Sequence, residues 1–205
     1  MNKNNYFEDK YTINFSNRVD KNGEDDIFVQ RWSPRSFENK ELEYSVYESI
    51  FGAARWTQSC FNEQPWLFVT ESGKQDRELF ENLLLPGNRK WAQNASLIGY
   101  IFCRRNFRRN NKPNRWAGFD TGASWMAITL QARLYGLYTH GMAGIDKEKV
   151  YSELNVSEEN YEILCGFVIG VIDTPEKLDE DSQKREVPSA RKDLSEIWHR
   201  GKLKK

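Results

Sequence analysis

A short basic segment is the first part of the chain whose residue types could do chemistry. Arg31, Ser33 and Arg35 occupy alternate positions in the sequence Arg-Trp-Ser-Pro-Arg, so an extended backbone would place their side chains on one face. Two planar guanidinium groups beside a hydroxyl suit a dianionic phosphate, because each guanidinium can donate a bidentate pair of hydrogen bonds. Taken alone, the same spacing also fits a solvated basic turn that precedes a helix.

A second segment, residues 56–66, has the sequence Trp-Thr-Gln-Ser-Cys-Phe-Asn-Glu-Gln-Pro-Trp. It places amide, hydroxyl and thiol groups beside aromatic rings, which is the mixture that a heteroaromatic ring needs for edge hydrogen bonds and face packing. Pro65 fixes the backbone where the next apolar run begins. The alternative interpretation is a polar loop that caps a helix.

A third segment, residues 136–146, contains Gly136, Gly141 and Gly144. Glycine lets backbone N–H groups approach a ligand closely because no Cβ stands in the way. An ordinary connection between a helix and a strand is the competing interpretation. His140 lies in the same segment. It could donate a proton or be a structural residue in a glycine-flanked turn, and we favour the structural role.

Several common cofactor and catalytic signatures are absent from the sequence. No G-x-G-x-x-G or G-x-x-x-x-G-K-[ST] sequence occurs, which argues against a Rossmann dinucleotide domain and a phosphate-binding NTPase loop. The chain has two histidines, His140 and His199, three cysteines without C-x-x-C spacing, and no G-x-S-x-G elbow. Zinc sites and serine-hydrolase triads are therefore not expected. Redox, binding and structural roles remain.

The composition is that of one globular domain. The 205 residues carry 30 basic and 30 acidic side chains, so a polyanionic partner such as nucleic acid is not expected. No stretch approaches the roughly 18–20 apolar residues that a membrane span needs, and the polar first ten residues do not resemble a signal segment. The odd number of cysteines favours a reducing, cytoplasmic location. We expect residues 1–27 to form an N-terminal extension or helix and residues 28–205 a single domain.

The elements that must position these segments follow from hydrophobic periodicity. Four-residue steps of apolar side chains predict helices, and short apolar runs between turn residues predict buried strands. Helices and strands without a βαβ rhythm favour an α+β fold. The predicted helices are 41–55, 74–85 (ended by Pro86-Gly87), 120–135 (with Ala123, Ala127, Leu130 and Leu134 on one face) and 147–154; the predicted strands are 66–70, 97–103 and, centrally, 163–172; residues 138–145 are predicted as a loop or extended segment and 184–205 as a charged tail.

The three segments, in this order, resemble motifs of the nitroreductase family. Residues 31–35 are similar to its R-x-S-x-R phosphate motif, residues 58–66 to its P-S-x-x-N-x-Q-P-W segment, and residues 136–146 to its G-L-x(6)-G-F/I-D segment. Asn88, with the tryptophan, alanine and serine that follow it, looks like a fourth motif, N-x-x-W-x-x-x-A-S/P, and the helix from Asp120 resembles a fifth. The resemblance covers nearly the whole core of the chain, and five loose motifs in register are specific together.

The resemblance implies an α+β fold with a central, mostly antiparallel β-sheet flanked by helices, and an interlocked homodimer with FMN at its interface. It implies an FMN-dependent oxidoreductase that uses NAD(P)H to reduce nitroaromatics, quinones or similar electron-poor acceptors by ping-pong hydride transfer. One alternative is a same-fold flavin-binding or flavin-modifying protein without nitroreductase turnover. Another is a non-flavin module whose basic loop, residues 104–115, docks anions or nucleic acid. For this loop, a surface connection or a cover over the substrate site is the interpretation we favour.

Carried over position by position, the resemblance assigns cofactor contacts to these motifs. The phosphate and ribityl chain would be held by Arg31, Ser33, Arg35 and, near the C-terminus, Arg191, with Trp32 lining the cofactor. The flavin ring would be contacted by Ser59, Cys60 and Asn62 from across the dimer interface, by Asn88 at its pyrimidine edge, and by the backbone of Ala143 and Gly144 near N5. No catalytic residue is assigned.

Four positions depart from the family pattern. Gln58 replaces a proline, Cys60 a serine or alanine, Ala143 a glutamate of some members, and Trp91 a lysine at the flavin edge. These changes bear on the substrate and on the nicotinamide preference more than on FMN binding. Cys60 could be redox-active beside a flavin, although a lone thiol is usually a small packing group.

Overall fold

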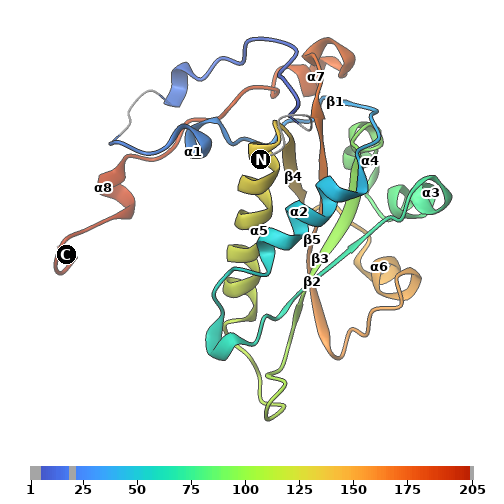
Figure 1. Ribbon diagram of the computed structural model, residues 1–205, viewed down its shortest axis with the longest axis vertical. Coiled ribbons are helices and arrows are strands. Elements are labelled where there is room, and N and C mark those ends of the chain that lie inside the picture. Colours follow the sequence, from blue (N-terminus) through green and yellow to red (C-terminus); the bar gives the residue numbers. More distant parts are fainter. Residues whose placement is uncertain (1–5, 19–21, 204–205) are drawn as a thin grey trace.

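A five-stranded sheet is the centre of the computed structural model, which describes residues 6–18 and 22–203 (Figure 1). β5 runs through its middle, with β3 and then β2 on one side, and with β4 and β1 paired to successive parts of the other side. Every pairing is antiparallel. The predicted α+β class, the antiparallel sheet and its central strand are therefore confirmed. The strands are β1 (Phe37–Glu38), β2 (Trp66–Thr70), β3 (Leu97–Arg104), β4 (Tyr138–Met142) and β5 (Tyr161–Ile172).

Helices cover both faces of this sheet. α2 and α5 pack on one face, and α3, α4 and α6 pack on the other (Figure 1). Because both faces are covered, β3 is apolar from Leu97 to Cys103: Tyr100 and Phe102 point into one core and Ile101 into the other. The helices are α1 (Asp26–Gln30), α2 (Tyr44–Ala54), α3 (Lys74–Asn82), α4 (Pro86–Ala92), α5 (Ala117–Leu134), α6 (Lys147–Glu153), α7 (Glu180–Gln183) and α8 (Leu194–Ile197), with 3-10 turns at η2 (Ser16–Arg18), η3 (Cys60–Asn62) and η4 (Pro175–Lys177).

Pro86 begins a helix as well as following one. The predicted helix over residues 74–85 is too long, because α3 ends at Asn82 and α4 starts at Pro86. Proline is well tolerated at the first helical position, where its missing N–H has no partner to lose. The fourth motif, which begins at Asn88, therefore starts on a helix that hydrophobic periodicity did not reveal.

The buried face of α5 also differs from the sequence pattern. Its core side includes Ser124, Thr129 and Ala132. The two hydroxyls are satisfied within the helix, because Ser124 and Thr129 each donate to a backbone oxygen one turn earlier, so polar residues can face the sheet. The apolar face that periodicity picked out is instead half-buried or exposed; it consists of Ala123, Ala127, Leu130 and Leu134.

The N-terminal segment, with α1, and the C-terminal tail, with α8, extend to the same side of the sheet (Figure 1). The N–H of Phe7 donates to the backbone oxygen of Tyr135 (2.8 Å). Gly136 has φ +78°, and a Cβ there would collide with the Phe7 backbone, so only glycine fits. The Tyr138 hydroxyl donates to the Asp9 carboxylate (2.8 Å). The N-terminal segment is thus tied to the end of α5 and the start of β4.

None of the described helices is long and apolar enough to cross a membrane. In the same part of the chain, no group of three or more His, Cys, Asp or Glu side chains is arranged to hold a metal ion.

Candidate functional site

The basic segment connects α1 to β1, and its burial alternates from residue to residue. Trp32 and Pro34 are buried, whereas Arg31, Ser33 and Arg35 are half-buried and share the more accessible side. This places three donors that suit an anion along one strip. The side chain of Trp32 packs edge-on against Tyr138, with 6.3 Å between ring centroids. Its Nε1 is buried and has no hydrogen-bond partner among the described residues.

Two side chains, half-buried His140 and buried Glu186, fix the backbone of this strip. Nδ1 of His140, on β4, lies 2.7 Å from the backbone oxygen of Pro34. The carboxylate of Glu186 accepts hydrogen bonds from the N–H groups of Arg35 (2.7 Å) and Ser36 (2.8 Å). Hydrophobic periodicity could not predict the contact made by Glu186, because this residue lies in the polar tail and 151 residues separate it from Arg35.

A third arginine, absent from the sequence motif, joins the strip to the C-terminal tail. Arg18 donates from Nη1 to the backbone oxygens of Val29 (2.7 Å) and Arg31 (2.8 Å), and from Nε to that of Ser189 (2.9 Å). One guanidinium therefore connects three parts of the chain. No sequence signal could have identified Arg18, because its role depends on segments that are 13 and 171 residues away.

Arg18, Arg31 and Arg191 are close enough to repel one another. Burial, followed by the charges of Arg191 and Arg31, lowers the pKa of Arg18 to about 10. Burial and then Arg191 lower the pKa of Arg31. No ion pair of Arg31 or Arg191 with a carboxylate occurs in residues 6–18 and 22–203. The structure thus brings the predicted residues Arg31 and Arg191 together, in an arrangement that an anion would stabilise.

A second group of predicted residues meets where β4 ends. Asn88, near the start of α4, donates from Nδ2 to the backbone oxygen of Gly144 (3.0 Å), and the Leu85 N–H donates to the same oxygen (3.1 Å). A Cβ at Gly144 would lie 2.7 Å from Asn88 Nδ2. Ala143 is exposed beside this contact. Asn88, Ala143 and Gly144, which are distant in sequence, therefore form one site.

Trp91 connects the second group to the basic strip. Its ring is buried and lies 4.7 Å from the His140 ring and 6.3 Å from the Phe37 ring, centroid to centroid. The side chain that stands at the family's lysine position is thus part of the core. Trp91 is on α4 and His140 is on β4, so this contact packs α4 against the strand whose His140 binds the Pro34 backbone.

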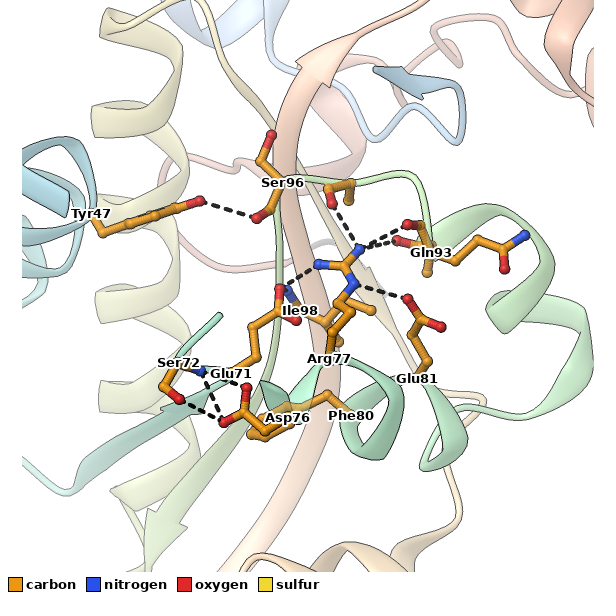
Figure 2. A network of polar contacts seen from close by, with 12 residues as sticks. Tyr47, Glu71, Ser72, Asp76, Arg77, Phe80, Glu81, Gln93, Ser96 and Ile98 are labelled. Atoms are coloured by element: carbon orange, nitrogen blue, oxygen red, sulfur yellow. Dashed lines mark hydrogen bonds and ion pairs between the residues drawn. The ribbon is translucent and has the colours of Figure 1, made fainter. Parts of the chain in front are cut away.

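Arg77 holds the connection between α4 and β3 (Figure 2). Its guanidinium donates to the backbone oxygens of Gln93 (2.9 Å) and Ala95 (2.7 Å) and forms an ion pair with Glu71. Glu71 also accepts a hydrogen bond from the N–H of Ile98 (3.0 Å). This network fixes the end of the helix that carries Asn88 and Trp91.

The third group lies in the loop between α2 and β2. The N–H of Cys60 donates to Asp120 at the start of α5 (3.0 Å), and the Ser59 hydroxyl accepts from the N–H of Gln64 (3.0 Å). Asn62 is exposed, and Ser59 and Cys60 are half-buried. The loop therefore presents polar groups outward and is anchored from within.

Within one chain, this loop and the basic strip lie at opposite ends of the sheet (Figure 1). Phe37, just after the strip, pairs with Ile172, whereas Trp66, just after the loop, pairs with Cys103, which pairs with Glu162. β5 has 12 residues, and at about 3.3 Å per residue the two groups are roughly 35 Å apart. No single mononucleotide can contact both groups of one chain.

Several solved structures are similar to this chain. No protein-family profile and no curated protein matches the chain. A crystal structure of an oxidoreductase containing FMN is 34% identical, with a TM-score of 0.87, and the match covers 94% of this chain and 99% of that one.

More distant structures share the fold. A nitroreductase family protein from Streptococcus pneumoniae TIGR4 is 17% identical (TM-score 0.69; 86% of this chain and 98% of that one). A protein assigned as an NAD(P)H:FMN oxidoreductase, from Staphylococcus epidermidis, is 14% identical (TM-score 0.70; 92% and 99%).

Proposed function

Because this chain belongs to the nitroreductase family, we propose that it is an FMN-dependent oxidoreductase that uses NAD(P)H to reduce electron-poor acceptors such as nitroaromatics and quinones, in a ping-pong cycle. The observation that carries the proposal is that Arg18 links Arg31 (2.8 Å) to the backbone oxygen of Ser189 (2.9 Å), to which Arg191 also donates (3.1 Å). Arg31 and Arg191, from opposite ends of the sequence, thus meet without a carboxylate partner among the described residues. The basic strip also carries Ser33 and Arg35.

The donor set of the strip fits the phosphate end of FMN. Guanidinium groups give bidentate, charge-assisted hydrogen bonds to phosphate oxygens, and the mutual repulsion of these arginines would be relieved by a dianion. When bound, FMN would supply the hydride chemistry, and the protein would supply binding and orientation. Arg31, Ser33, Arg35 and Arg191 are the residues that would hold the phosphate and ribityl chain.

The second group would orient the ring. Asn88 has one amide donor committed to Gly144, which leaves its carbonyl and its second N–H for the pyrimidine edge. The backbone of exposed Ala143 and half-buried Gly144 would lie at the other end of the same ring. We assign no proton transfer to His140, because its Nδ1 is used by Pro34 and burial lowers its pKa to about 4.

We further propose that the working form is a homodimer with two sites. Ser59, Cys60 and Asn62 lie roughly 35 Å from the strip in their own chain, by the strand spacing given above, so a second protomer would have to supply them. α5 also exposes an apolar surface outside the core: Phe119 is 72% exposed and Met126 36%. The two residues are seven positions apart in α5 and so lie on one face of the helix, and exposed apolar side chains on one face favour an interaction site. The three cysteine thiols of the chain are free, in keeping with a cytoplasmic location.

The absorption spectrum and turnover of the purified protein test the proposal together. We expect a yellow protein, or an apo-protein that takes up added FMN, and consumption of NADH or NADPH when a nitroaromatic or quinone is present. A yellow protein with negligible NAD(P)H oxidation would point to the flavin-binding or flavin-modifying alternative. A protein that fails to bind added FMN would refute the cofactor assignment.

Two variants test the site and the assembly separately. Arg35→Ala should weaken FMN binding by about 2–5 kcal/mol, because it leaves phosphate charge buried and unpaired, whereas Arg200→Ala in the exposed tail should not. Met126→Glu should shift the protein toward monomer in sedimentation velocity and lower its FMN content. A dimer unaffected by Met126→Glu would place the interface elsewhere.

A further inference from the structure

A polar hollow lies between the loop that joins α2 to β2 and the basic loop of residues 104–115. Its volume is about 560 Å³, and it is lined by Asn62, Glu63, Gln64, Trp66, Arg108 and Arg109. Asn62 belongs to the loop that is proposed to contact flavin across the dimer interface. The hollow therefore adjoins the position where a co-substrate would meet the flavin.

The backbone beneath the hollow is strained. Phe61, Asn62 and Gln64 have φ of 55°, 56° and 48°, all in the left-handed region, where residues other than glycine are uncommon. Three such residues within four positions persist only when their surroundings hold them. Here the Ser59 hydroxyl accepts the Gln64 N–H (3.0 Å) and the Asn62 backbone oxygen accepts the Gln64 amide (3.0 Å). Strain of this kind concentrates at ligand-binding sites.

Arg109 is held over this loop by aromatic rings. Its guanidinium carbon lies 3.7 Å from the centroid of the Phe61 ring and 5.4 Å from that of Phe107, and the two rings pack edge to face at 6.0 Å. Stacking uses the flat face of a guanidinium and leaves its N–H edge free to bind a carboxylate or phosphate. The stack therefore pre-orients Arg109.

The donors of Arg109 are not used within the described part of the chain. No hydrogen bond or ion pair of its side chain occurs among residues 6–18 and 22–203. Glu63, the carboxylate that lines the hollow, accepts the backbone N–H of Arg108 (2.8 Å). Two guanidiniums against one carboxylate leave the hollow with a net positive charge, which attracts anions.

We propose that Arg109, supported by Arg108, binds an anionic group of the co-substrate. The enzyme would therefore select co-substrates that bear a phosphate monoester or a carboxylate. The proposal rests on the proposed function, and it deepens it by naming a substrate class. The anion could belong to the nicotinamide donor, as the phosphate that distinguishes NADPH from NADH, or to an acidic electron acceptor. Either source would present an anionic oxygen to the N–H edge of the Arg109 guanidinium. Comparing a more anionic with a less anionic ligand of each kind distinguishes the two sources.

The test compares charged and neutral probes on the oxidised, FMN-loaded protein. Perturbation of the flavin spectrum gives dissociation constants for NADP+ against NAD+, and for 4-hydroxybenzoate against 4-hydroxybenzamide. We expect the wild type to favour the more anionic member of one pair by roughly ten-fold or more, as for a hydrogen bond to a charged group. Arg109→Gln should bring that ratio close to one and leave the affinity for the less anionic member unchanged. The pair that responds identifies the source of the anion.

Arg115→Gln is the matched control, because it removes the same charge from the same loop without lining the hollow. It should keep the wild-type ratios. If Arg109→Gln retains its FMN and both ratios stay as in the wild type, or if Arg115→Gln changes them equally, the assignment to Arg109 is overturned while the proposed function stands. A wild-type protein that binds no FMN overturns the proposed function and this inference with it.

Discussion

Nδ1 of His140 lies 2.7 Å from the backbone oxygen of Pro34, so β4 holds the segment that carries the proposed phosphate-binding arginines. Burial is the main cause that lowers the pKa of His140 to about 4, and Arg35 acts in the same direction. The ring is therefore neutral at pH 7, and its single N–H donates to Pro34. This geometry supports the structural role that we favoured for His140 from the sequence.

His140 should make the free energy of unfolding depend on pH in the acidic range. The ordinary pKa of histidine, 6.5, applies to the unfolded chain, and the folded value is about 4. As pH falls, the unfolded state takes up the proton first, so stability that is fully present above pH 6.5 is lost between about 6.5 and 4. We expect a loss on the order of 1–3 kcal/mol in urea unfolding. His140→Gln should flatten that slope, and exposed His199→Gln should not; equal slopes would contradict the assignment.

Gly144→Ala should disturb the flavin site without unfolding the protein. The new Cβ would lie 2.7 Å from Asn88 Nδ2, and this amide can swing away because it is the end of a side chain. We expect a melting temperature near that of the wild type and altered FMN affinity. Asn88→Ala should have an effect that is not additive with Gly144→Ala, since both act through one contact. Gly141→Ala, where the nearest atom lies 3.9 Å away, should change nothing.

Arg18→Ala should weaken FMN binding more than riboflavin binding. The variant releases the Ser189 region, and hence Arg191, from the strip and removes a positive charge beside Arg31. The expected loss for FMN is about 1.5–3 kcal/mol, as for hydrogen bonds made by a charged group. Titration of apo-protein with both flavins measures it. Arg18→Lys should recover only part of the loss, because one ammonium cannot reach all three oxygens in the fork geometry. Equal losses for both flavins would indicate a purely structural role.

Arg77→Ala should destabilise the whole fold. Glu71 would be left buried and without its cation, and removal of one partner of a buried pair costs about 3–5 kcal/mol. Burial already raises the pKa of Glu71, and Arg77 counteracts the rise. Urea unfolding at pH 7 should show the loss, and it should shrink at pH 5 as the unpaired carboxyl takes up a proton. Arg89→Ala on the exposed side of α4 should stay close to the wild type.

Three strands, β2, β3 and β5, were the most predictable part of the fold, whereas β1 (Phe37–Glu38) was not predicted. β2 coincides with the predicted residues 66–70, and β3 and β5 extend their predicted runs by one or two residues. The reason is physical. β3 and β5 are covered on both faces and β2 pairs with β3, so their apolar runs differ clearly in the sequence from the polar turns around them. The α6 helix was equally clear; the Asp146 carboxylate caps it by accepting a hydrogen bond from the backbone N–H of Lys149.

The missed features depend on contacts between distant segments. Pro86 could end a helix or begin one, and only the packing of Trp91 against His140 decides between them. The inward face of α5 can include Ser124 and Thr129 because both hydroxyls bond to backbone oxygens of their own helix. Glu186 and Arg18 act on the basic strip from 151 and 13 residues away. Local pattern carries no information about such partners.

The distance along β5 between the basic strip and the Ser59–Asn62 loop has a genetic consequence. In the proposed dimer each cofactor would rest on the strip of one chain and the loop of the other. A chain impaired only in its strip and a chain impaired only in its loop would then complement each other when mixed. Their heterodimer would hold one site built entirely from intact parts and one built entirely from damaged parts. Each heterodimer would therefore have about half of the activity of a wild-type dimer, although both parent proteins are inactive.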